Sequence, residues 1–360
     1  MKKNNTSRLE IKSISIDKVP AQRRWGARVI RMLFLSPLFL WGMASLRFGS
    51  WDERLCLAMA IIYAVLFFGV IILAPIRKVI LFCFAVFLMP LALFFLMQPS
   101  LDRDWQPDVA VLPYAEIKGN EVFIHHVRHC DYITETDYAV NDETRTYNLS
   151  KLKSVDIMLT DWGLKYIAHT MVSFGFEGDN YLCFSIETRK EVGESYSALK
   201  GFFRQYELIY IAADERDPVR LRTNFRKGEN VYLYRLKVAS MENLTQFFME
   251  YVNRINQMHE NPKWYNALTQ NCMTSAFRLA RKHAAPGRGK WHWSIILNGF
   301  ADRHAYEVGT IDTSLPFDEL KRISCINKRA LAAGSSPDYS KLIRQGIPGM
   351  DWVPGKRGIE

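Results

Sequence analysis

Two long apolar stretches near the start of the chain restrict its fold most strongly. Residues 55–76 and 79–101 contain 22 and 23 residues without a charged side chain. A helix needs about 20 such residues to cross the hydrocarbon core of a bilayer. We therefore expect both stretches to be transmembrane helices.

A third and shorter apolar stretch, residues 32–46, precedes them. It holds 15 uncharged residues between Arg31 and Arg47, and arginine side chains at helix ends can reach the lipid headgroups. We expect this stretch to span the membrane too. The alternative is an interfacial or signal-like segment.

Basic residues set the expected orientation. Residues 1–28 contain eight Lys or Arg against Glu10 and Asp17, which is most of the total charge of +10. Basic flanks stay in the cytoplasm, and three spans that start there place the later residues in the periplasm. The charge therefore fits a multi-pass protein of the inner (cytoplasmic) membrane with the bilayer as partner, and no nucleic acid is expected as a partner.

This reasoning divides the chain into three parts. The division is a basic cytoplasmic tail (1–28), three N-terminal transmembrane helices (29–101) and a periplasmic domain (102–360) whose core covers about residues 160–285. The domain pattern is α+β, because strand-like and helix-like segments follow one another in it.

Three local patterns define the elements of this domain. Residues 166–174 and 181–188 read as a hairpin around the turn Gly178-Asp179-Asn180. Residues 241–258 repeat apolar side chains at helical spacing, and a further helix follows Cys272. The charged run at residues 214–226 reads as a solvated, salt-bridged face.

The sequence gives little support for a metal site or for a disulfide framework. His125, His126, His129 and Cys130 stand close together in sequence, but on a strand they divide between two faces. The six cysteines show no CxxC pair, so no disulfide framework is indicated. We expect no metal and no cofactor.

Cys272 is the best candidate nucleophile. It follows a polar, turn-prone segment and opens a helix, with Thr269 or Asn271 as the N-cap. Free N–H groups and the helix dipole stabilise a thiolate in the first helical turn. The alternative is an ordinary buried cysteine.

A thiol enzyme also needs a base and a group that orients the base. His169 is the candidate base, because it lies in a mostly apolar strand beside a turn. Glu187 on the partner strand and Asp179 in the turn are the two candidates for the orienting acid. The order His, acid, Cys reverses the order of papain-like enzymes, and such triads are recognised by geometry rather than by chain order.

Seven short motifs within residues 102–349, about two thirds of the chain, resemble the Lnb-type lipoprotein N-acyltransferase family. The motifs are Ile167-Ala168-His169-Thr170, Phe174-Gly175-Phe176, Ser185-Ile186-Glu187-Thr188-Arg189, Arg204-Gln205-Tyr206-Glu207-Leu208, Asp214-Glu215-Arg216 with Leu221-Arg222-Thr223-Asn224, Asn261-Pro262-Lys263-Trp264-Tyr265, and Asn271-Cys272-Met273-Thr274. The last motif departs from the family's usual Asn-Cys-Thr-Thr at Met273.

The resemblance implies a circularly permuted papain-like domain of the NlpC/P60 type. It implies a membrane-bound thiol acyltransferase that moves an acyl chain from phospholipid to the N-terminus of a lipoprotein through a Cys272 thioester. Cys272, His169 and Glu187 would be catalytic, and substrate would be bound by Asn271, Tyr206, Trp264 and Arg204. A periplasmic cysteine peptidase or amidase and a non-catalytic binding module remain as alternatives.

Overall fold

The computed structural model describes residues 21–75, 78–284 and 289–355, with side chains from Leu33 onward. Residues 1–20, most of the expected basic tail, lie outside the described residues. The chain divides into two compact units, Met1–Leu96 and Met97–Glu360.

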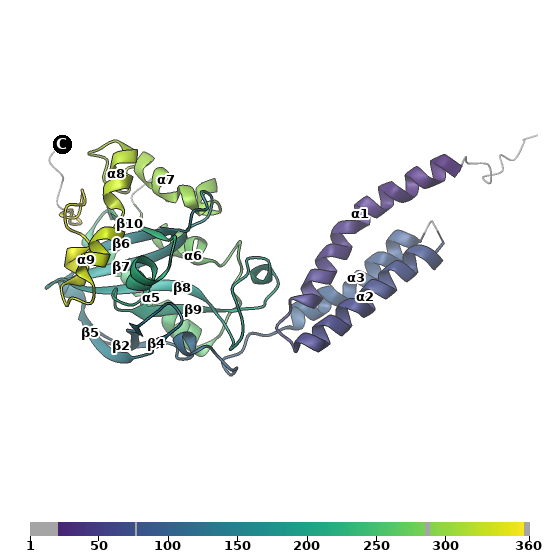
Figure 1. Ribbon diagram of the computed structural model, residues 1–360, viewed down its shortest axis with the longest axis horizontal. Helices are drawn as coiled ribbons and strands as arrows, with labels where there is room; N and C mark the ends of the chain where they lie inside the picture. The colour runs from purple at the N-terminus through teal and green to yellow at the C-terminus, as the bar shows by residue number, and fades with distance from the viewer. Residues whose placement is uncertain (1–20, 76–77, 285–288, 356–360) are drawn as a thin grey trace, which may run out of the picture. The chain divides into compact units, whose positions relative to one another are not determined.

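The first unit contains three helices that pack on one another (Figure 1): α1 (Ala21–Arg47), α2 (Glu53–Leu73) and α3 (Val79–Leu96). Asp52 caps α2 by accepting hydrogen bonds from the backbone N–H groups of Arg54 and Leu55. By length and composition α2 and α3 can cross a membrane, whereas the apolar part of α1, Leu33–Arg47, is shorter. Spanning by α1 stays a prediction.

The second unit is a sheet with helices on both faces (Figure 1). Its strands are β1 (Tyr114–Lys118), β2 (Glu121–Arg128), β3 (Asp131–Tyr132), β4 (Tyr138–Ala139), β5 (Asp142–Asn148), β6 (Leu152–Asp161), β7 (His169–Phe176), β8 (Asn180–Arg189), β9 (Glu207–Ala213) and β10 (Asn230–Arg235). Its helices are α4 (Pro218–Arg220), α5 (Met241–Glu260), α6 (Cys272–Ala280), α7 (Ala301–Glu307), α8 (Phe317–Ser324), α9 (Asn327–Ala333) and α10 (Tyr339–Leu342), joined by short turns that include η5 (Leu221–Phe225) and η6 (Trp293–Ile295).

The strand order in the main sheet is β1-β2-β9-β8-β7-β6-β10, with β5 paired to β2 and a separate β3–β4 ribbon. All its pairs are antiparallel except β2 with β9, which meet in parallel at Arg128 and Ala213. The mixed α+β class expected from the sequence is therefore confirmed.

The hairpin predicted around Gly178 is formed by β7 and β8. Gly178 and Asp179 adopt φ values of 78° and 56°, which a tight turn requires and which Asp tolerates better than most residues. The strands then pair in a regular register, for example Met171 with Ser185. Continuing this register by two residues places His169 opposite Glu187.

Helices α5 and α6 cover one face of the sheet. The predicted apolar positions of α5 are buried, including Phe247, Phe248 and Tyr251, which pack on Phe174 and other strand residues. Ser240 caps this helix by accepting the N–H of Asn243. Helices α9 and α10 cover the other face, through a smaller cluster of side chains.

The charged run at residues 214–226 is not the solvated face that its composition predicted. Asp217 is fully buried and accepts two bonds of 2.8 Å from Arg128. Glu215 is also fully buried and accepts bonds of 2.6 and 2.8 Å from Arg344. The prediction was wrong because the two arginines come from 89 and 129 residues away, and no local pattern indicates such pairing.

Candidate active site

Cys272 is the first residue of α6, as the sequence predicted. Asn271 is the N-cap: its side chain accepts the N–H of Thr274, and the Thr274 hydroxyl accepts the N–H of Asn271. This reciprocal capping box fixes the start of the helix. Thr269, the other candidate cap, bonds Asn266 instead. The Cys272 side chain therefore lies in the first turn, where the helix dipole favours a negative charge.

His169 and Glu187 face one another across the β7–β8 hairpin. The Nε2 atom of His169 lies 3.0 Å from Oε1 of Glu187. Ser185, between them, has its hydroxyl 2.8 Å from the same His169 nitrogen and donates to Glu187 at 2.7 Å. With Nε2 committed in this way, Nδ1 is the ring nitrogen left for another partner.

Cys272 is the third member of this group. Its thiol lies close enough to His169 for each side chain to shift the pKa of the other, and the backbone of Thr170 lies beside the sulfur. The structure therefore brings Cys272, His169 and Glu187 together, as the activation of a thiol requires.

Cys272, His169 and Glu187 shift one another's pKa values. Burial lowers the pKa of His169, but the Glu187 carboxylate and Cys272 together outweigh burial and raise that pKa to about 9. Burial raises the pKa of Cys272, but His169 and the backbone of Thr170 together outweigh burial and lower that pKa below its ordinary value of 9.0. Burial also acts to raise the pKa of Glu187, which His169 and Arg222 hold well below its usual range. Both shifts favour a thiolate on Cys272 beside a protonated His169.

Arg222 belongs to the site, although the charged run around it was interpreted as a solvated face. Its Nη2 atom donates to Oε1 of Glu187 at 2.9 Å, and the residue is only 6% exposed. It lies in η5, a single π-helical turn, and such turns occur often at functional sites. The presence of Arg222 in one of the family-like motifs was the available signal.

Asp179, the rival acid, lies elsewhere. Its side chain is 54% exposed at the tip of the hairpin, where Lys341 approaches it at 3.8 Å. No described contact joins it to His169. The geometry therefore favours Glu187 as the orienting acid.

Cys183 shows what a structural cysteine looks like in this fold. It is fully buried in the middle of β8, and burial raises the pKa of its thiol well above the ordinary value. The contrast with Cys272 is one of surroundings. Arg222 and Arg344 lower the pKa of Cys183 less than burial raises it, whereas Cys272 has His169 beside it and opens a helix.

Two tyrosines beside Cys272 were not singled out in the sequence. Tyr265 and Tyr196 lie close to one another and to Cys272. Burial, followed by the charge of Cys272, raises the pKa of Tyr265. Tyr265 is 7% exposed, whereas Tyr196 is 54% exposed. The two side chains place hydroxyl groups near the thiol of Cys272.

Three of the four residues expected to bind substrate lie on neighbouring segments, and the fourth adjoins Cys272. Asn271 adjoins Cys272 and caps its helix. Tyr206 is fully buried, and its hydroxyl bonds the backbone of Ser195 and Ser197. Trp264 and Arg204 both donate to the carbonyl of Met97, at 3.3 and 3.2 Å. A role in substrate binding stays a prediction for these four residues.

The histidines of β2 have separate partners. A bulge between Ile124 and Val127 interrupts the strand, and His126 adopts a φ of 59° there. His125 stacks on Tyr114 and bonds Thr144, whereas His126 bonds Asp142. Within the described residues no group of three His, Cys, Asp or Glu is placed to hold a metal ion.

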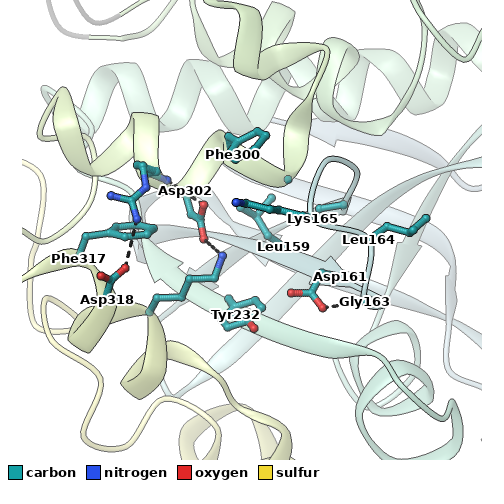
Figure 2. Close-up of a pocket in the computed structure, with 14 residues that line it drawn as sticks. Leu159, Asp161, Gly163, Leu164, Lys165, Tyr232, Phe300, Asp302, Phe317 and Asp318 are labelled. Atoms are coloured by element: carbon teal, nitrogen blue, oxygen red, sulfur yellow. Dashed lines mark hydrogen bonds and ion pairs between the residues drawn. The ribbon is translucent and has the colours of Figure 1, made fainter.

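A cavity of about 270 Å³ begins beside Ala168, the residue before His169 (Figure 2). Charged pairs line it, with Lys321 bonded to Asp302 at 2.7 Å and Arg303 near Asp318 at 3.2 Å. Cys272 and Glu187 are not among its lining residues, so the cavity is a neighbour of the triad rather than part of it.

Comparison with known families adds one finding to this geometry. Residues 139–299, which include Cys272, His169 and Glu187, match the family model described as Lnb N-terminal periplasmic domain. This domain belongs to the Lnb family. No curated protein matches the chain, and no solved structure matches it. With the two membrane-capable helices, the Lnb domain makes this a membrane protein with a periplasmic domain.

Met273 can now be placed within the Lnb domain. It is 5% exposed and packs in an apolar cluster with Leu159 and Ile295. The capping box uses Asn271 and Thr274 alone. Methionine at position 273 therefore fills a core site and leaves the start of α6 intact.

Proposed function

We propose that this protein is a membrane-bound thiol acyltransferase that moves an acyl chain from phospholipid to the N-terminal amino group of a lipoprotein. The observation that supports it best is the position of Cys272, which opens α6 beside His169, while His169 contacts Glu187. A thiolate held next to an imidazolium is suited to attack an ester carbonyl.

In the first half of the proposed reaction, the Cys272 thiolate attacks the carbonyl carbon of a phospholipid ester. A carbon–sulfur bond forms, and the bond to the glycerol oxygen breaks. His169 supplies the proton that the leaving alkoxide needs, while Glu187 keeps the ring oriented and stabilises its positive charge. The products are an acyl thioester on Cys272 and a lysophospholipid.

In the second half, the amino group of the acceptor attacks the thioester. An amide bond forms, the carbon–sulfur bond breaks, and His169, neutral after the first half, takes the proton from the nitrogen. The thiolate and imidazolium are then restored. This is a ping-pong sequence, in which one site serves two substrates in turn.

The membrane helices support the lipid part of the proposal. A donor and an acceptor that both carry acyl chains stay in the bilayer, so an enzyme anchored there meets both of them. We further propose a multi-pass inner-membrane topology with three spans and a permuted papain-like fold of the NlpC/P60 type. The fold proposal is supported by a Cys-bearing helix packed on an antiparallel sheet that carries the His and the acid.

The direct test uses the full chain in phospholipid vesicles with a synthetic diacylated lipopeptide that has a free α-amino group. The proposal predicts an N-acylated product by mass spectrometry, lost in Cys272→Ala and retained in Cys183→Ala. Cleavage of cell-wall peptides without acylation would instead identify a peptidase or amidase. An absence of product and of any acyl adduct would identify a binding module.

Topology is tested separately by reporters fused after Glu360. A periplasm-dependent reporter should be active there, and a cytoplasm-dependent one should be silent. The reverse result would mean that the first apolar stretch does not cross.

A further inference from the structure

The loop between β6 and β7 exposes apolar side chains instead of burying them. The exposed side chains are those of Trp162, Leu164, Tyr166 and Ile167, with Tyr166 57% exposed. Large apolar groups in a row on a surface usually mark a binding face.

A second segment, far away in sequence, has the same character. Residues 291–297 expose Trp291, Trp293, Ile296 and Leu297, with Trp291 62% exposed. Ser294 and Ile295, between them, are buried. The segment is thus anchored by its centre while its indole rings and aliphatic chains face outward.

Specific contacts join the two segments into one surface. The amide side chain of Asn298 bonds both the N–H and the carbonyl of Ala168, and the N–H of Gly299 donates to the carbonyl of Tyr166 at 3.1 Å. A Cβ at position 299 would lie 2.3 Å from the carbonyl oxygen of Lys165, so only glycine permits this approach.

An aromatic bridge crosses the junction. The ring of Phe300 lies 5.8 Å from that of Tyr166 and 5.3 Å from that of Trp293. We call the eight exposed side chains of the two segments the aromatic surface. Figure 2 shows Leu164, Lys165 and Phe300, which also line the cavity beside Ala168.

Both segments of the aromatic surface adjoin the candidate active site. The first ends one residue before Ala168, which precedes His169. The second packs through Ile295 on Met273, the residue after Cys272. A partner that binds this surface therefore lies beside the nucleophile and its base.

We propose that the aromatic surface inserts into the interfacial layer of a lipid bilayer. Trp and Tyr prefer this layer, because an apolar ring with a polar edge suits the boundary between headgroups and acyl chains. Lys165 and Lys290, both exposed, stand next to these rings and suit anionic headgroups. The chain also carries α2 and α3, which by length and composition can cross a membrane, and this favours a bilayer as the partner of the aromatic surface.

This inference concerns where the domain binds, and it does not require acyl transfer. It is tested on the full chain in vesicles of phosphatidylethanolamine and phosphatidylglycerol, in a background with Cys272→Ala and Cys325→Ala. Leu164→Cys or Trp291→Cys then adds one exposed cysteine, which carries an environment-sensitive fluorophore, while the four native cysteines that remain are buried. Leu331→Cys and Ile133→Cys are matched controls, because these apolar side chains are 65% and 73% exposed outside the aromatic surface.

Lipids that carry a nitroxide near the headgroup should quench the labels at 164 and 291, whose emission should also shift to the blue. The labels at 331 and 133 should instead be quenched by iodide in the water. Labels at 164 and 291 that respond only to iodide would overturn the proposal. Protection from both quenchers would overturn it too, since it would indicate that a protein covers the surface.

Discussion

Arg222 and His169 meet at a single oxygen atom, Oε1 of Glu187, which they approach to 2.9 and 3.0 Å. The carboxylate therefore stands between two basic side chains, and His169 together with Arg222 holds its pKa well below the usual range despite burial. This makes Arg222 a positioning residue, which acts on the nucleophile through Glu187 and His169.

Arg222→Met should lower acyl transfer by about 10- to 100-fold, the loss expected for one hydrogen bond to a charged group. The pKa of Glu187 should rise without its guanidinium partner. As the solution is made more acidic, the rate of Cys272 alkylation should therefore begin to fall at a higher pH in the variant than in the unchanged protein. Arg216→Met is the control, because Arg216 pairs with Asp214 and its own side chain is 37% exposed. A lower rate with an unchanged pH profile would mean that Arg222 is merely structural.

The pH dependence of the site follows from the pair of shifted groups. Cys272 should react with iodoacetamide at a lower pH than an ordinary thiol, since His169 lowers its pKa below the ordinary value of 9.0. His169 loses its proton only near its pKa of about 9, so acyl transfer should fall as the pH rises through that value while alkylation persists. In His169→Gln the thiol pKa should rise, and alkylation should then require alkaline solution. Equal alkylation profiles in both proteins would contradict the ion pair.

The orienting acid is tested by two isosteric changes. Glu187→Gln removes the charge that holds His169, and we expect a large loss of activity, up to the about 10⁴-fold seen in a serine-protease triad. Asp179→Asn should be silent, because that side chain lies at the exposed tip of the hairpin. Full activity in Glu187→Gln together with a large loss of activity in Asp179→Asn would show that Asp179, and not Glu187, is the orienting acid.

The buried ion pairs predict where the fold is vulnerable. Asp217→Ala leaves Arg128 buried without its charge partner and should destabilise the domain by about 3–5 kcal/mol. Asp318→Ala removes an Asp–Arg pair whose carboxylate is 90% exposed, and it should cost less than about 1 kcal/mol. Thermal unfolding of the two variants should separate them clearly. Similar Tm values would mean that the buried pair adds little.

The parts of the site that local sequence encodes were predictable. The cap that places Cys272 in the first turn lies within four residues, and the hairpin that sets His169 opposite Glu187 lies within about twenty. In both cases one short stretch supplies the turn, the strand pattern and the chemically active residue.

Contacts made over longer distances were not predictable from a single sequence. Arg222 reaches Glu187 from 35 residues away, and its own neighbours suggested a solvated face. Arg344 reaches Glu215 over 129 residues. The aromatic surface was missed for the same reason, because Gly299 joins two segments that look unremarkable when read separately.

The central claim is that Cys272 forms an acyl-enzyme, and intact mass spectrometry tests it most directly. Incubated with phospholipid but no amine acceptor, the full chain should gain the mass of one fatty acyl chain less water. The adduct should be released by hydroxylamine, be absent in Cys272→Ala and persist in Cys183→Ala. An adduct that remains in Cys272→Ala, or one that maps to Cys183, would contradict the account.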